Sequence, residues 1–356
     1  MSLQVVTVIG LVLIYLFSKQ AKDWRKTFLW MAGIWLIFIM GSRSAINELT
    51  DEVVYYNRYK VLSGYSFAEL RDSNYMGENS DRGFYFLYWV FARLIPWPQF
   101  SQYLIVGISV IGFFRFFYRN SEDVYVSVLL FLAFGTLSFY LSGVRQGFAM
   151  FFCLMALQKA QERRFWRFLF WVWIAYTMHD SAFVFLPVYV LLWLDPGARG
   201  KIMNFLLLAV IFLGGGMIMA VYVRYANEEG YLDQYYSASA IGYIIQIIIM
   251  VLPILLSGMR FSRFYDKEKL HQFHLELILS LGIAFFILRT RYWSYERVSY
   301  YYSFAVLAAL PNSVSHLPAS IDNEGTKKVI RLLSITLCIA LYLYRFHTPL
   351  AFFWSA

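Results

Sequence analysis

Apolar stretches of roughly 14 to 20 residues follow one another from Leu3 to Phe346 and occupy most of the 356-residue chain. A helix needs about 20 mostly apolar residues to cross the hydrocarbon core of a bilayer. The chain is therefore predicted to be an all-α integral membrane protein. Its composition agrees, because 60% of the residues are hydrophobic and only 15% are charged, against about 25% charged residues in an ordinary soluble domain.

We predict about twelve transmembrane helices in a single polytopic domain over residues 1–356, with no room for a separate soluble domain. The predicted ranges are 3–18, 27–42, 100–117, 124–141, 143–158, 165–178, 181–194, 203–222, 240–258, 272–289, 298–314 and 329–346. A further apolar stretch, residues 83–95, is predicted to be re-entrant or interfacial. The first range lacks a preceding basic segment, so we expect it to be a retained anchor.

Basic residues predict which side of the membrane each loop faces. Of the 31 Lys and Arg residues, 19 fall in alternate loops, and such an excess marks the cytoplasmic side. Both termini and the segment 43–82 are then predicted to be extracytoplasmic. The net charge of +9 is accounted for by this topology and by contact with anionic membrane lipid, and no nucleic-acid partner is predicted.

Several ionisable residues lie at the ends of predicted spans on the extracytoplasmic side. An ionisable side chain at membrane depth costs about 2.5 to 3.5 kcal/mol even on permissive insertion scales, so a chain that gathers several of them is expected to use them. We predict that they contribute to one shared site. They are Arg43, Asp51, Asp81, Arg145, His179, Arg289, Arg291, Glu296 and Arg297.

The residue types suggest an anionic lipid-linked sugar as the ligand. Guanidinium groups suit the oxygens of a pyrophosphate, so five arginines are predicted to bind one: Arg145, Arg297, Arg43, Arg289 and Arg291. Tyrosine rings stack on sugars and their hydroxyls reach sugar oxygens. Predicted glycan-binding residues are Tyr55, Tyr59, Asp81, Gln146, Tyr295, Glu296 and Tyr301.

Transfer of a sugar from a lipid pyrophosphate needs a base for the attacking hydroxyl, and His179 or Asp51 could supply it. No metal and no cofactor is predicted, because the chain has no paired metal carboxylates, P-loop or dinucleotide-binding motif. Cys153 and Cys338 lie inside apolar stretches without metal-ligand spacing. They are expected to form neither a disulfide nor a zinc site.

Five short motifs occur in order along residues 40–310. They are Arg43, Asp51 and Tyr55 after the second predicted span; Asp81, Gly83 and Phe84; the Ser-Gly-Val-Arg-Gln-Gly of Ser142 to Gly147; Ala175, His179, Ser181 and Ala182; and Glu296 with Arg297. In this order they resemble the Wzy-type bacterial polysaccharide polymerases, specifically the EpsG-like branch.

This resemblance implies a GT-C-like membrane glycosyltransferase in the bacterial cytoplasmic (inner) membrane. Such a polymerase transfers a growing glycan from undecaprenyl pyrophosphate to the non-reducing end of a lipid-linked repeat unit. Its active site faces the periplasm or cell exterior. A flippase and a chain-length regulator are its implied partners.

Other readings of the same residues stay open. An O-antigen ligase or another lipid-linked glycosyltransferase would use the same chemistry on a different acceptor. A lipid-sugar flippase or secondary transporter would need discontinuous helices, for which the interruption of one span by Gly214 to Gly216 is the only hint, although close helix packing explains it better. A scaffold subunit would need no clustered arginines.

Overall fold

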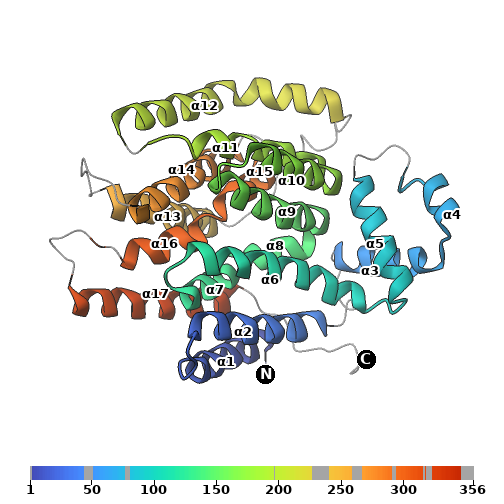
Figure 1. Cartoon of the computed structure of the whole chain (residues 1–356), viewed down its shortest axis with the longest axis horizontal. Coiled ribbons are helices and arrows are strands. Elements are labelled where there is room, and N and C mark those ends of the chain that lie inside the picture. Colours follow the sequence, from blue (N-terminus) through green and yellow to red (C-terminus); the bar gives the residue numbers. More distant parts are fainter. Residues whose placement is uncertain are drawn as a thin grey trace. The chain divides into compact units, whose positions relative to one another are not determined.

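The computed structural model describes residues 2–43, 51–76, 81–195, 197–226, 240–258, 267–290, 294–315, 317 and 323–345. These residues form helices, labelled in Figure 1, and no β-strand is found among them. The chain folds into two compact units. The first contains residues 1–183 and 332–356, and the second contains residues 184–331.

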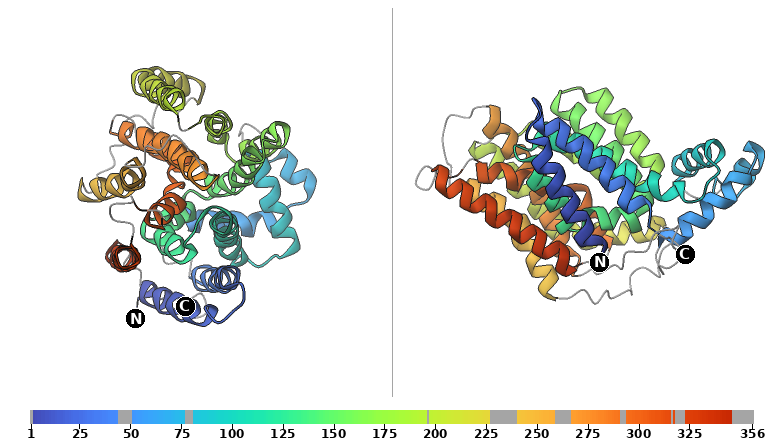
Figure 2. Two further views of the ribbon diagram at one scale, coloured as in Figure 1. Left: turned by 60° about the vertical axis from the view of Figure 1, so that its left-hand side comes forward. Right: turned by 90° about the horizontal axis from the view of Figure 1, so that it is seen from below.

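The first unit is built around one long central helix. Its helices are α1 (Leu3–Ser18), α2 (Trp24–Gly41), α3 (Asp51–Gly64), α4 (Phe67–Asp72), α5 (Arg82–Leu94), α6 (Phe100–Asn120), α7 (Val124–Ala133), α8 (Thr136–Ser142), α9 (Val144–Gln161) and α10 (Phe165–Met178). Helix α6 packs against α2, α8 and α9, while α1 packs against α2 and α10 against α9. The pair α1 and α2 is drawn in blue in Figure 2. Helices α3 and α5 pack together, and α5 also contacts α10.

Polar side chains fix where several of these helices begin. Ser2, Asp23, Ser66 and Asp123 each accept a hydrogen bond from a backbone N–H in the first turn of α1, α2, α4 and α7. Such caps satisfy backbone donors that have no partner within the helix. At the start of α4, Glu69 also bonds back to the Ser66 amide and completes a capping box.

The second unit is organised around α14. A 3₁₀ helix (Asp180–Phe185), which contains the boundary between the units, leads into α11 (Pro187–Leu191). The helices α12 (Ala198–Ala226), α13 (Ala240–Gly258), α14 (Lys267–Leu288), α15 (Ser294–Ser303) and α16 (Val306–Ser315) follow. The last described helix, α17 (Glu324–Arg345), begins in the second unit, and its residues from Leu332 onward belong to the first. Helix α14 packs against α11, α12, α13, α15 and α16. Helix α12 runs through Gly214 to Gly216 without a break, and Tyr295 donates a hydrogen bond to the Gly215 carbonyl. Gly215 therefore lies at a packing contact, beside Leu288 and Tyr295.

Every range predicted to be a helix is helical over most of its length, and three are divided. The predicted range 124–141 breaks between α7 and α8 and bends there by 50°. Gly135 has φ 81° at this break, a backbone conformation that glycine adopts without steric cost. The range 298–314 divides at Phe304 and Ala305, and the range 181–194 divides into the 3₁₀ helix and α11.

Length and hydropathy identify membrane-crossing helices within the described part of the chain. Two segments, Phe100–Asn120 and Leu270–Leu288, are long and apolar enough to cross a membrane, and the bent pair α7 and α8 would make a third. Helix α5 has 13 residues and is therefore about 20 Å long, too short for a hydrocarbon core of about 30 Å. It buries Phe84, Tyr85, Tyr88 and Ala92, which is the amphipathic pattern expected of a non-spanning helix.

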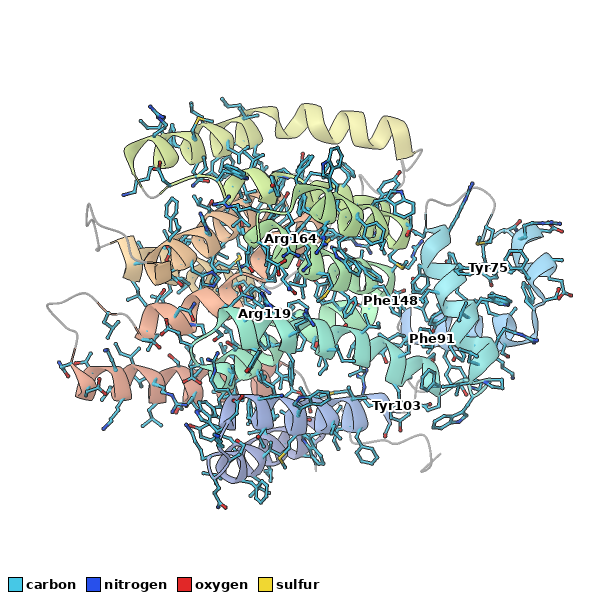
Figure 3. All side chains as sticks on the ribbon, in the orientation of Figure 1. Tyr75, Phe91, Tyr103, Arg119, Phe148 and Arg164 are labelled. Atoms are coloured by element: carbon cyan, nitrogen blue, oxygen red, sulfur yellow. The ribbon has the colours of Figure 1, made fainter. Side chains whose placement is uncertain are left out.

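Helices α9 and α10 form an antiparallel pair whose connection holds a cluster of charges. Glu162 accepts hydrogen bonds from Lys159 (2.9 Å) and Gln158 (2.7 Å). Arg164 lies 3.5 Å and Arg119 lies 3.8 Å from its carboxylate, and both are labelled in Figure 3. We call these five residues the Glu162 cluster. It joins the ends of α6 and α9 to the start of α10.

Replacing Glu162 by glutamine should lower the thermal unfolding midpoint by about 2 °C, because three cations would then face one another. Hydrogen bonds from Lys159 and Gln158 lower the pKa of Glu162 from 4.5 to about 2. The carboxylate thus stabilises the fold fully above pH 4.5, and this contribution is lost as pH falls toward 2. In thermal unfolding in detergent, the midpoints of the wild-type and Glu162→Gln proteins should therefore differ at pH 7 and differ less below pH 4. Equal midpoints at pH 7 would contradict the prediction.

Candidate functional site

Three elements of the first unit bring charged side chains together. Asp81 precedes α5, Arg145 lies in the first turn of α9, and His179 directly follows α10. Because α10 packs against both α5 and α9, residues that are 34 to 98 positions apart in the sequence become neighbours. The sequence analysis grouped these three residues, and in the structure Asp81 is in direct contact with both Arg145 and His179.

Gly83 permits the close approach of α5 to α10 beside this site. A Cβ atom at position 83 would lie 2.7 Å from Cβ and 2.9 Å from the carbonyl oxygen of Thr177. Real side chains essentially never come so close, and the neighbouring backbone has no freedom to yield. Glycine in the Asp-X-Gly-Phe motif is thus required by packing, and it sets the distance between Asp81 and His179.

Asp81 binds two partners through its two carboxylate oxygens. Oδ2 accepts a hydrogen bond from Arg145 Nη1, and Oδ1 lies 3.3 Å from His179 Nδ1. Only 5% of the Asp81 side chain is exposed, against 33% for Arg145 and 17% for His179. The carboxylate therefore forms the buried base of the site, and the guanidinium remains reachable from outside.

The charges around Asp81 keep it ionised at neutral pH. Burial of the carboxyl group opposes ionisation, but hydrogen bonding to His179 and the charge of Arg145 hold the pKa of Asp81 below its ordinary value of 3.8. A carboxylate can only accept, so His179 must carry its proton on Nδ1 when it bonds to Asp81. In the neutral imidazole the other ring nitrogen, Nε2, is then an acceptor, and no residue in the described part of the chain bonds to it.

Aromatic residues of α3 and α5 pack next to Arg145. Tyr55 Oη accepts a hydrogen bond from Arg145 Nε at 3.1 Å, and the Tyr55 ring meets Phe84 edge-on at 5.7 Å. Phe84 in turn packs edge-on against Phe148 of α9 at 5.1 Å, a residue labelled in Figure 3. Burial, opposed by the charge of Arg145, raises the pKa of Tyr55. Tyr55 therefore stays a neutral phenol that orients Arg145.

Two residues of this site were missed by the sequence analysis, namely Arg58 and Tyr85. Arg58 Nη1 donates to Tyr85 Oη at 2.9 Å, and the Arg58 guanidinium carbon lies 5.3 Å from the centre of the Tyr55 ring. Helical spacing could have identified both. Arg58 follows Tyr55 by three positions and Tyr85 follows Asp81 by four, so each pair shares a helix face.

The remaining predicted residues of the first unit occupy other positions. Asp51 is exposed at the start of α3, whereas the adjacent Glu52 is buried and pairs with Arg43 at 2.7 Å. Tyr59 is fully buried and donates to the carbonyl oxygen of Ile95 at 3.1 Å. Gln146 is buried next to Arg145 in α9.

In the second unit, Arg289 is paired with Glu296 at 2.9 Å and is 12% exposed. Its guanidinium carbon lies 4.8 Å from the centre of the Tyr243 ring and 4.7 Å from that of Phe286. Tyr295 and Tyr301 are buried in α15, and Arg297 belongs to the same helix. Arg291 lies outside the described residues. The convergence of these residues with Arg145 stays a prediction.

Asp81, His179 and Asp180 are also the residues that could hold a metal ion. Each offers one ligand atom, and the three atoms lie within 4.8 Å of one another. However, Arg145 already contacts Asp81 Oδ2, and its fixed positive charge would repel a divalent cation at the same carboxylate. These residues therefore fit an arginine-bound carboxylate better than a metal centre.

We expect the activity of the protein to be unaffected by EDTA. In the reaction predicted from the sequence, the guanidinium of Arg145 supplies the positive charge that a metal would otherwise provide to a leaving pyrophosphate. The measurement is the rate of product formation in membranes washed with chelator, with and without added Mg²⁺, Mn²⁺ or Zn²⁺. Loss of activity that one of these ions restores would assign the metal to Asp81, His179 and Asp180 instead.

The apolar helices and this partly buried cluster of ionisable groups are features of a membrane protein with a polar functional site. The sequence pattern of the EpsG family matches residues 26–355, which is nearly the whole chain, and the protein belongs to this family. Family membership makes it a polysaccharide-polymerase-like membrane protein. No curated protein and no solved structure matches the chain.

Proposed function

We propose that the protein is a metal-independent polysaccharide polymerase. It transfers a growing O-antigen or exopolysaccharide chain from undecaprenyl pyrophosphate to the non-reducing end of a lipid-linked repeat unit. The observation that carries this proposal is the double contact of Asp81. One buried carboxylate holds a cation suited to pyrophosphate, Arg145, and a base suited to a sugar hydroxyl, His179.

In the proposed reaction, His179 acts on the attacking hydroxyl of the acceptor, and Arg145 acts on the leaving pyrophosphate of the donor. His179 Nε2 removes the proton from the acceptor hydroxyl while its oxygen attacks the anomeric carbon of the donor sugar. The bond from that carbon to the pyrophosphate oxygen breaks, and undecaprenyl pyrophosphate leaves. Arg145 stabilises the negative charge that accumulates on the leaving group. Asp81 fixes the imidazole tautomer and orients the guanidinium.

The other predicted residues take supporting roles in this proposal. Arg297, Arg289 and Arg291 belong to the pyrophosphate site, and Arg43 supports α3 through Glu52. The proposed glycan-binding site includes Gln146, Tyr59, Tyr295, Glu296 and Tyr301. Asp51 remains the alternative base, although the described contacts bring Asp81 rather than Asp51 to His179.

We further propose a single polytopic domain with twelve crossings and a GT-C-like arrangement, with the site facing the periplasm or cell exterior. The two ends of α9 support this orientation. Arg145 and Lys159 are 14 positions apart on that helix, which corresponds to about 21 Å along its axis. The cation-rich Glu162 cluster is thus at the end opposite to the site, as the positive-inside rule requires of a cytoplasmic end.

Deleting the gene in its host and restoring it tests this function. The surface-glycan ladder on a gel should collapse to a single repeat unit on lipid or core after deletion, and the restored gene should bring back the ladder. Loss of even the single repeat would favour a ligase or a flippase. Helix α12 runs through Gly214 to Gly216 without a break, so these glycines do not mark a discontinuous helix of the kind that a transporter would use. The described break between α7 and α8 keeps that alternative as an outcome of this test.

A further inference from the structure

Arg58 is a charged residue of the site for which the proposed reaction has no role so far. It lies on α3, one helical turn after Tyr55, and donates to the hydroxyl of Tyr85 at 2.9 Å. Its guanidinium carbon lies 5.3 Å from the centre of the Tyr55 ring and 5.9 Å from that of Tyr85. Two phenol rings therefore hold the guanidinium in place by cation–π attraction.

Within the described part of the chain, no carboxylate pairs with Arg58. The two oxygens of Asp81 face Arg145 and His179, so this carboxylate neutralises only one of the two arginines. Tyr55 lies between them, with its hydroxyl bonded to Arg145 and its ring beside Arg58. Among the described residues, Arg58 is thus the arginine of this site that has no acidic partner.

Both arginines can be reached by a ligand, whereas the groups that hold them cannot. Tyr55 is 6% and Tyr85 is 3% exposed, while Arg58 is half-buried and Arg145 is 33% exposed. A guanidinium has five N–H donors, and Arg58 uses one of them on Tyr85. The others are available to an oxyanion.

We propose that Arg58 is a second pyrophosphate-binding residue, which holds the lipid pyrophosphate together with Arg145. This inference rests on the proposed function and extends it, because it names the partner of Arg145 within the same unit. A pyrophosphate has two phosphoryl groups. The two planar guanidinium groups of Arg58 and Arg145, one on each side of Tyr55, match such a ligand. The fixed positions of the forks add affinity because little side-chain freedom is lost on binding.

Binding of geranyl pyrophosphate to the full-length protein in detergent, followed by titration calorimetry, tests the inference. Arg58→Gln should weaken binding roughly tenfold or more, the effect of losing a charged hydrogen bond. Arg58→Lys keeps the charge without the planar fork and should be intermediate. Tyr85→Phe removes the acceptor of Arg58 Nη1 and should weaken binding by a smaller factor.

Arg93→Gln is the matched control. Arg93 is an exposed arginine of the same unit, and its hydrogen bond among the described residues is to the carbonyl oxygen of Ser63, so its removal should leave the affinity unchanged. Glucuronate, which carries a carboxylate in place of a phosphate, should not compete. Preferential binding of glucuronate would overturn the assignment to pyrophosphate.

The two claims fail in different ways. If Arg145→Gln weakens binding but Arg58→Gln does not, the role of Arg58 is wrong and the proposed function stands. If wild-type protein binds no geranyl pyrophosphate, the Arg58 inference is overturned whatever the glycan ladder shows. If deletion of the gene leaves the ladder intact, the proposed function is wrong even where Arg58 contributes to binding.

Discussion

Replacing Arg145 by alanine should slow glycan chain growth by roughly 100-fold to 1,000-fold, the usual effect of removing one group that stabilises a developing anion. Arg145 is the exposed partner of the buried Asp81 carboxylate, and Tyr55 fixes its orientation through Nε. In the proposed reaction, its charge is therefore held in place before the pyrophosphate leaves. The measurement is the rate of polymer formation in membranes with equal amounts of inserted protein.

The same change leaves a buried carboxylate without its guanidinium, which by itself can destabilise a fold. Arg145→Gln provides the necessary control, because glutamine keeps an N–H donor while removing the charge. Thermal unfolding should be closer to wild type for this variant, and its activity should remain low. Arg93→Ala, which removes an exposed arginine of the same unit, should retain activity. Unaltered chain length in a folded and inserted Arg145→Ala protein would contradict the account.

Replacing His179 by asparagine should lower turnover by roughly 100-fold to 10,000-fold, the range expected for loss of a general base. Asparagine can still donate a hydrogen bond to Asp81 from a position close to that of Nδ1, but it has no group in place of Nε2. We therefore expect the affinity for lipid-linked donor to change little while kcat falls. Initial rates over a range of donor concentrations separate these two effects.

Asp51→Asn tests the other candidate base. Asp51 is exposed at the start of α3, and the described contacts of His179 are to Asp81 and Asp180. We expect most of the activity to survive this change. An inactive Asp51→Asn protein together with an active His179→Asn protein would reverse the assignment of the base.

The sequence predicted the positions of helices well because hydropathy sets them directly. Helix α1 and helix α10 begin and end at the predicted residues. The break at Gly135 could not be located in this way, since the residues on both sides of it are mostly apolar and include no charge. A glycine in such a run is compatible with a continuous helix as well as with a left-handed turn.

The sequence predicted which residue types the site contains, but not which of their side chains contact one another. Asp81 was predicted to bind the glycan, which stays a prediction, and its bonds to Arg145 and His179 were not foreseen. These contacts depend on how α5, α9 and α10 pack, which one sequence does not determine. The burial of Glu52 beside the exposed Asp51 was not predicted, for a local reason. Adjacent helical residues point about 100° apart, and without the buried face of α3 the sequence could not indicate that Glu52 is the one that turns inward.

Polymerisation by the purified protein in a lipid bilayer tests the central claim most directly. The full chain would be reconstituted with a lipid-linked repeat unit of its host, without added metal, and the products would be separated by length on a gel. The account predicts a ladder of products in steps of one repeat unit, with one undecaprenyl pyrophosphate released for each linkage, and no ladder for His179→Asn. Movement of the repeat unit across the bilayer, or its transfer to another acceptor without chain growth, would contradict it.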